Sequence, residues 1–228
     1  AGAERVHLTL RDDASVDAVL ATAGLAPGQT VVDHSTLDPH QTRARVAAWA
    51  ARGVTYVHAP VFMGPSNALE ASGLMLVSGD AAAVEALTPA LTALTGRLVP
   101  LGADPGRAAV FKLCGNLFLI FFTSGLAEML RLGRAHGERA ESVIELFDWF
   151  NPGPTIGARA KRMVSGDLSK PSWELQMARK DAAVMLDSVA GQNALRILPA
   201  ILEEMDRWIA RGHGADDWTI IGRDGVSP

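Results

Sequence analysis

Residues 108–136 read AAVFKLCGNLFLIFFTSGLAEMLRLGRAH. The apolar residues of this stretch continue through a length that predicts one helix of roughly eight turns. Gly115 and Gly125 lie inside it and indicate close packing against another helix rather than a break. The stretch separates two parts of the chain that have different patterns.

The part before the long helix alternates between strand and helix patterns. Strands are expected at Val6–Leu10, from Val31 to about Ser35, and at Val54–Val61, Leu74–Val77 and Leu98–Leu101. Helices are expected at Ala14–Ala23, from Asp38 to Gly53, and at Ala81–Leu94. This alternation predicts a largely parallel sheet with crossover helices.

The part after Gly106 shows only helical patterns, with further helices expected at 138–150, 155–164, 173–189 and 195–210. The predicted fold class is therefore α/β: a partial Rossmann-type parallel sheet, residues 1–103, followed by an all-helical domain, residues 104–228, built on one long helix. No Gly-x-Gly-x-x-Gly turn occurs, so the sheet matches the later part of a doubly wound domain. A complete but smaller α/β domain is the alternative interpretation.

Composition excludes several classes of partner. The 228 residues carry a formal net charge of −4 without a basic run, which disfavours nucleic acid and anionic membranes. The apolar run Leu117–Phe122 is too short to cross a bilayer by itself. Cys114 is the single cysteine, which suits a reducing compartment, and a cytoplasmic protein is expected. The histidines lack metal-ligand spacing, so no metal is expected.

Lys112 and Asn116 are the leading candidates for chemistry. They are four residues apart on the predicted long helix, so their side chains project from one face among apolar neighbours. Burial lowers the pKa of a lysine and makes its amine a usable proton donor or acceptor near neutrality. A solvated lysine near a helix start is the simpler interpretation of the same residues.

Two other polar pairs carry weaker signals. Thr36 follows Ser35 at the carboxyl end of a predicted strand, where ligands bind in open α/β sheets, although a helix entry explains these residues equally well. Lys180 and Asp181 form a pair on a predicted helix, and an exposed basic patch with Arg179 accounts for them.

Five stretches in order resemble the β-hydroxyacid dehydrogenases, the group that includes 3-hydroxyisobutyrate dehydrogenase, tartronate semialdehyde reductase and 6-phosphogluconate dehydrogenase. Residues 6–13, VHLTLRDD, are similar to the family's cofactor-passing strand and loop, and residues 33–39, DHSTLDP, to its D-x-S-T-x-x-P segment. Residues 59–64, APVFMG, stand where the family has A-P-V-S-G-G. Gly106 to Asn116 matches G-x-x-x-x-x-K-x-x-N-N, and Lys180-Asp181 matches the later K-D.

The resemblance implies a small-molecule enzyme that uses NAD or NADP, with the site between a Rossmann domain and a helical domain. Lys112 would be the catalytic acid/base. Asn116 would bind substrate together with the turn formed by Phe62, Met63 and Gly64. Cofactor contacts would come from Leu10, Arg11, Thr36 and Lys180. The resemblance also implies a homodimer formed through the helical domain, as does a helix that is apolar on all sides.

Departures from the family pattern bear on cofactor and substrate. The glycine-rich unit is absent from the sequence, so no residues are assigned to phosphate binding. We therefore expect the chain alone to bind NAD(P) weakly or not at all, and to show no turnover. Phe62 and Met63 replace the family's Ser and first Gly, and Gly115 replaces its first Asn, which makes the pocket more apolar.

The expected reaction is hydride transfer between nicotinamide and a small hydroxy acid or its semialdehyde. Two alternatives remain: a reductase of small aldehydes or imines on the same scaffold, and a non-catalytic binding or assembly module derived from a dehydrogenase. Imine-reducing relatives usually replace the lysine, so Lys112 favours a carbonyl or hydroxyl substrate.

Overall fold

The computed structural model describes residues 2–192 and 194–226, and the chain divides into two compact units, Ala1–Leu119 and Ile120–Pro228. The division falls inside helix α5 (Arg107–Ala135), whose first turns belong to the first unit. The domain limits inferred from the sequence, 1–103 and 104–228, lie just before this helix and stay a prediction.

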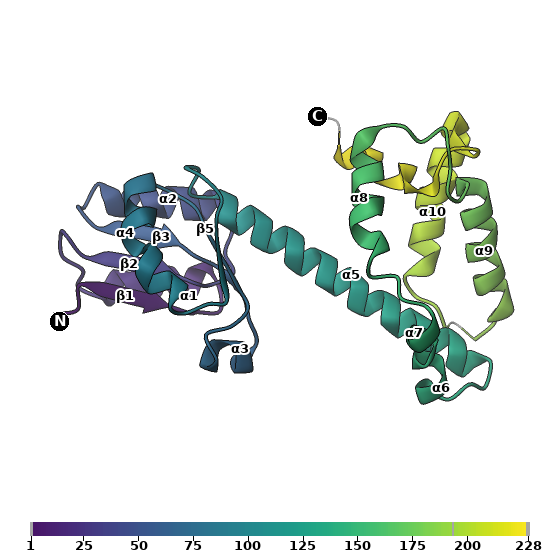
Figure 1. The fold of residues 1–228 in the computed structure, drawn as a ribbon, viewed down its shortest axis with the longest axis horizontal. Helices are drawn as coiled ribbons and strands as arrows, with labels where there is room; N and C mark the ends of the chain where they lie inside the picture. The colour runs from purple at the N-terminus through teal and green to yellow at the C-terminus, as the bar shows by residue number, and fades with distance from the viewer. Residues whose placement is uncertain (1, 193, 227–228) are drawn as a thin grey trace. The chain divides into compact units, whose positions relative to one another are not determined.

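Two small sheets form the first unit (Figure 1). The first is parallel and contains, in spatial order, β1 (Arg5–Leu8), β2 (Thr30–Asp33) and β3 (Thr55–His58). The second contains β4 (Val61–Phe62), β5 (Leu74–Val77) and β6 (Arg97–Pro100), with β4 antiparallel and β6 parallel to β5. An isolated bridge between His58 and Ser78 links the two sheets. The helices of this unit are α1 (Asp13–Thr22), α2 (Pro39–Ala50), α3 (Pro65–Leu69) and α4 (Ala81–Thr92).

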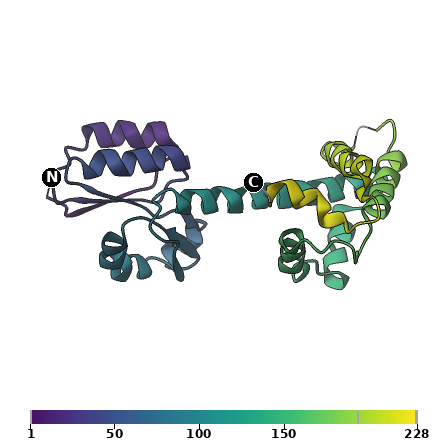
Figure 2. The same cartoon turned by 90° about the horizontal axis from the view of Figure 1, so that it is seen from above.

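Alternation along the central strands produces two cores. Because successive side chains of a strand point to opposite faces, Val31 and Val32 of β2 enter different cores. Val31 packs in the core that includes Val16 of α1 and Trp49 of α2, and Figure 2 shows these two helices side by side over one face of the sheet. Val32 packs on the other side, in the core that contains Leu87 and Leu91 of α4.

Aspartates start three of these helices and thereby fix where each strand-to-helix loop ends. Asp12 accepts a hydrogen bond from the Ser15 amide, Asp38 from the amides of His40 and Gln41, and Asp80 from that of Ala83. Such caps satisfy amides that have no partner within the helix.

The second unit is helical in the residues that the structure describes. It contains the rest of α5, then α6 (Ala140–Ile144), α7 (Leu146–Trp149), α8 (Thr155–Ser165), α9 (Leu175–Ser188), α10 (Leu198–Trp208), the π-helical turn Ile209–His213 and the 3₁₀ segment Trp218–Gly225. Its core is built on Leu175 and Ala178 of α9, Met205 and Trp208 of α10, and Ile220.

Sequence patterns located most elements but two predictions are wrong in detail. The single strand expected at Val54–Val61 is two short strands, because the chain changes partner after His58: β3 pairs with β2, whereas β4 pairs antiparallel with β5. The single helix expected at 138–150 is the pair α6 and α7, which meet at Glu145. The short α3 was not expected.

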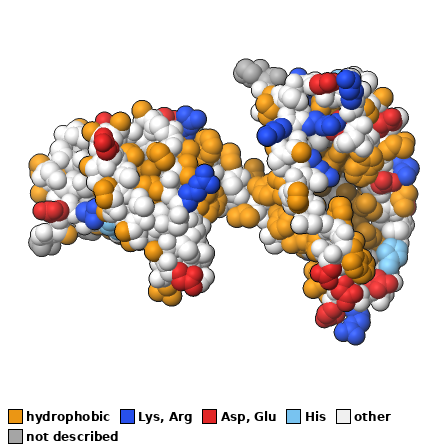
Figure 3. Space-filling model, in the orientation of Figure 1, with side chains coloured by type: hydrophobic (Ala, Val, Ile, Leu, Met, Phe, Trp, Pro, Cys, Tyr) orange, Lys and Arg blue, Asp and Glu red, His pale blue; other side chains and the backbone are white. Residues whose placement is uncertain are grey.

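Helix α5 leaves much of its apolar surface exposed in the chain. Leu117, Leu119, Ile120 and Phe121 are each more than half exposed, and orange apolar side chains are visible along α5 in Figure 3. Among the described residues, α5 is the one helix whose length and composition alone would allow it to span a membrane. The run Leu117–Phe122 is therefore only part of a longer apolar segment, Arg107–Ala135.

Candidate active site

Hydrogen bonds tie together the carboxyl ends of the three parallel strands. The amide of Leu10, after β1, donates to Ser35 Oγ at 2.9 Å. His58, the last residue of β3, contacts the Ser35 carbonyl through Nε2 at 2.9 Å. Ser35 is 2% exposed, so its hydroxyl serves the fold and is not available to a ligand. The exposed residue at the end of β2 is its neighbour Thr36.

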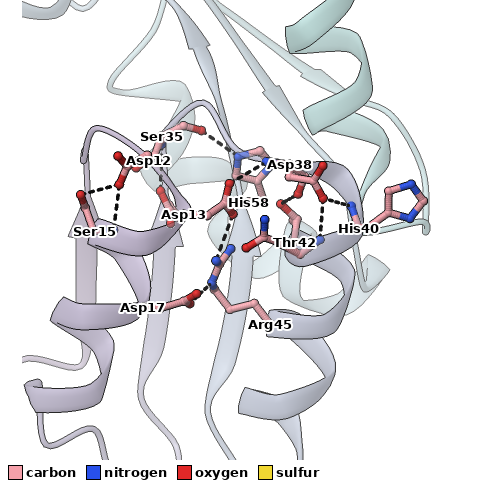
Figure 4. A network of polar contacts seen from close by, with 12 residues as sticks. Asp12, Asp13, Ser15, Asp17, Ser35, Asp38, His40, Thr42, Arg45 and His58 are labelled. Carbon is pink, nitrogen blue, oxygen red and sulfur yellow. Dashed lines mark hydrogen bonds and ion pairs between the residues drawn. The ribbon is translucent and has the colours of Figure 1, made fainter.

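The buried guanidinium of Arg45 links α2 to α1 beneath these loops (Figure 4). Arg45 donates to Asp17 at 2.7 Å and to Asp13 at 3.0 Å. Burial opposes its charge, but these hydrogen bonds outweigh burial and raise the pKa of Arg45. Asp13 also accepts from the Asp38 amide at 3.0 Å, so the same network positions the loop that carries Thr36.

The start of α5 is fastened to the end of β5. Ser78 Oγ accepts a hydrogen bond from the Ala108 amide at 2.9 Å, and Ser78 is also bridged to His58. Gly106 lies directly under the Arg43 guanidinium, and a Cβ at this position would come within 2.5 Å of it. These contacts place the first turns of α5 at the same edge as the ends of β1, β2 and β3.

Lys112 and Asn116 lie together on α5, as their spacing predicted. Lys112 Nζ donates to Asn116 Oδ1 at 3.0 Å, and Lys112 is 9% exposed. Burial lowers the pKa of Lys112, because the ammonium loses hydration. The amine also lies 4.1 Å from the ring centroid of Phe62. A hydrogen-bonded lysine whose pKa is lowered by burial gives up its proton more readily than a solvated lysine, so it can exchange a proton with a substrate oxygen.

The turn after β4 is less able to bind an anion than its family position implies. Met63 packs against the core that contains Met75 and Val77, so its side chain is part of the fold. The Gly64 amide already donates to Asn67 Oδ1 at 2.9 Å. Phe62 is the residue of this turn that faces the lysine.

The remaining expected site residues are more dispersed. Leu10 and Thr36 lie at neighbouring strand ends, and the exposed Arg11 side chain pairs with Asp12 at 2.9 Å. Their place at the carboxyl edge of a parallel sheet fits a dinucleotide. Lys180 lies on α9 in the second unit, where its amine is 2.6 Å from Asp181.

The sequence did not reveal the residues that hold the carboxyl edge of the parallel sheet in place without lining a site there. Arg45 is 6% exposed, and nothing in its sequence context distinguishes it from a surface arginine. The contact between Phe62 and α5 was also missed, because it joins segments far apart in the sequence.

Comparison with known proteins supports the same reading. Residues 1–102 match the family model for the NAD binding domain of 6-phosphogluconate dehydrogenase. The chain is 29% identical over 201 residues to the 3-sulfolactaldehyde reductase of Escherichia coli (strain K12), which covers 87% of this chain and 67% of that protein. It is 33% identical over 199 residues to the 3-hydroxyisobutyrate dehydrogenase of Pseudomonas aeruginosa, covering 83% of this chain and 65% of that relative.

Solved structures agree on the fold. An imine reductase from Myxococcus stipitatus, solved in complex with NAD+, superposes with a TM-score of 0.89 at 20% identity, over 97% of this chain and 80% of that one. At this identity the likeness speaks for the fold. The family model and the relatives carry the comparison: the chain is similar to the β-hydroxyacid dehydrogenases, a family of NAD(P)-dependent oxidoreductases.

Proposed function

We propose that the substrate is a small hydroxy acid or the corresponding semialdehyde, and that Lys112 is the acid/base of the reaction. The observation that carries this is the part-buried hydrogen bond of 3.0 Å from Lys112 Nζ to Asn116 Oδ1, on a helix fastened to the carboxyl edge of the sheet. A bound nicotinamide supplies or accepts the hydride. The protein must then give a proton to the substrate oxygen or take one from it.

Lys112 suits both directions because its pKa is lowered. In reduction its ammonium donates a proton to the carbonyl oxygen, and in oxidation its neutral amine removes the hydroxyl proton. Asn116 holds the amine through its side-chain oxygen, which leaves the amide nitrogen free to orient a substrate oxygen. Leu10, Arg11 and Thr36 are proposed to contact the nucleotide from the strand ends, and Lys180 from α9.

A reductase of small aldehydes or imines is the second candidate, and the apolar Phe62 near the amine favours it. We expect the intact enzyme to reduce succinic semialdehyde faster than the cyclic imine 1-pyrroline, with NADH or NADPH. The reason is that a carbonyl oxygen needs the proton that Lys112 holds, whereas an iminium is already protonated. Faster turnover of the imine with both nucleotides would contradict the proposal.

We also propose a homodimer in the cytoplasm, formed through α5. Leu117, Leu119, Ile120 and Phe121 form an apolar surface that a second copy would cover, and twofold symmetry is the commonest way to do so. Glu128 and Arg131 lie further along the same helix and form an ion pair at 2.8 Å, which suits a protein partner better than a lipid interior.

Light scattering tests the dimer. We expect a dimer mass at tens of micromolar protein, and a monomer mass after Ile120→Asp combined with Phe121→Asp. Leu69→Asp is the matched control, because Leu69 is 90% exposed on α3 and should not alter the mass. A monomer mass for the unmodified protein would contradict the proposal.

A further inference from the structure

The Phe62 ring occupies the space that a side chain at position 115 of α5 would fill. A Cβ built on Gly115 would lie 2.4 Å from the Phe62 ring, far inside van der Waals contact. Glycine at this position therefore allows the ring to lie against the helix backbone. The same ring covers the Lys112 amine, whose Nζ is 4.1 Å from the ring centroid.

The backbone that carries Phe62 is fixed from its other side. Phe62 pairs with Leu74 in the antiparallel contact between β4 and β5. Gly73 adopts a left-handed conformation beside it, with φ of +88°, and a Cβ there would approach the Phe62 carbonyl oxygen to 3.0 Å. Strand β4 cannot easily move away from α5. The ring therefore fits only because Gly115 has no side chain.

We propose that Phe62 and Gly115 form a size-matched pair that sets the specificity of the Lys112 site. The pair selects substrates whose substituent on the Phe62 side is an alkyl or aryl group, and disfavours a carboxylate there. This inference rests on the proposed function, since it assigns a substrate class to the same lysine.

The chemistry of the two surfaces gives the reason for this selection. The face of an aromatic ring is electron-rich, so it attracts the Lys112 ammonium and repels a carboxylate. A carboxylate placed there would lose its hydration without gaining a hydrogen-bond donor, because the Gly64 amide already donates to Asn67 Oδ1. An alkyl group would instead bury apolar surface against the ring.

A substrate pair and a set of variants test the proposal in the intact enzyme. Pentanal and succinic semialdehyde are similar in length and differ in the terminal carboxylate. Succinic semialdehyde belongs to the substrate class proposed above, so wild type should reduce it, at a kcat/KM that the pair of Phe62 and Gly115 lowers. The double variant Phe62→Ser with Gly115→Asn should shift the kcat/KM ratio toward succinic semialdehyde by about 10- to 100-fold. Phe62→Leu, which keeps an apolar wall, should leave the ratio within about threefold, well below that range.

Thermal unfolding tests the pairing without any need for activity. Gly115→Asn alone should lower Tm by about 4 °C or more, because the new side chain has to displace the ring. In the Phe62→Ser background the same change should lower Tm by much less. Gly157→Asn is the control, since Gly157 lies on α8 with open space around its Cβ position.

The outcomes separate the two proposals. A ratio that stays the same in the double variant, while both aldehydes are reduced, would overturn the specificity pair and leave the reaction class standing. Additive Tm shifts would overturn the size matching. If no variant reduces either aldehyde with either nucleotide, the proposed function fails and the specificity claim fails with it.

Discussion

Replacing Lys112 with alanine is expected to lower kcat of the intact enzyme by about 10²–10⁴-fold, the usual cost of losing a general acid/base. Affinity for the nucleotide should change little, because Lys112 contacts Asn116 and Phe62 rather than the strand ends that carry Leu10 and Thr36. Steady-state kinetics and nucleotide titration of the same variant measure the two quantities separately.

Two further variants show whether the effect belongs to proton transfer. Lys112→Arg keeps the positive charge but cannot lose its proton, so it should be nearly as impaired as the alanine variant. Cys114→Ala changes an exposed residue of the same helix and should leave kcat near wild type. If Lys112→Ala kept more than about half of wild-type kcat, far less than the usual loss, Lys112 would not be the catalytic group.

Replacing Asp217 with alanine should destabilise the second unit by about 3 kcal/mol or more, because it removes one partner of a buried charged network. Asp217 is fully buried and accepts hydrogen bonds from Ser172 at 2.7 and 2.8 Å and from Thr219 at 2.7 and 3.1 Å. Arg162 of α8 completes the network at 2.9 Å. Chemical denaturation measures the loss.

Asp206→Ala is the matched control, because Asp206 also pairs with an arginine, Arg179, but at the surface. Exposed pairs of this kind contribute about 0–1 kcal/mol. If the Asp217 and Asp206 variants lost the same free energy of unfolding, the buried network would contribute no more to stability than an exposed ion pair.

The Asp217 network also predicts an acid-sensitive stability. Burial raises the pKa of Asp217, but the hydrogen bonds from Thr219 and Ser172 outweigh it and hold the pKa below the usual carboxyl range. A lowered folded-state pKa gives stability that is present above the unfolded-state pKa and is lost as pH falls through the folded-state value. The difference between wild type and Asp217→Ala should therefore shrink in strong acid and persist at neutral pH.

Local patterns predicted the parts of this fold that depend on local interactions. The aspartate caps, the apolar alternation of β2 and the run of α5 are all readable from residues a few positions apart. Lys112 and Asn116 could be paired from the sequence for the same reason, because a spacing of four places two side chains on one helix face.

Long-range packing decided what the sequence did not reveal. The change of strand partner after His58 depends on the pairing of β4 with β5, and no residue between 54 and 61 indicates that partner. The contact of Phe62 with Gly115 likewise depends on how two segments meet, although the replacement of both family residues in one chain was visible in the sequence. Considered together, a larger residue at one position and a smaller one at the other could have suggested the contact.

The pH dependence of alcohol oxidation in wild type and in Lys112→Ala tests whether Lys112 is the proton acceptor. Oxidation requires the neutral amine, and burial lowers the pKa of Lys112, so the wild-type rate should rise as pH rises through that lowered value and then level off. Single-turnover bleaching or growth of the nicotinamide absorbance, with nucleotide prebound, reports this step. The alanine variant should be slow and should lack this rise. An identical rise with pH in the alanine variant would contradict the assignment of Lys112 as the proton acceptor.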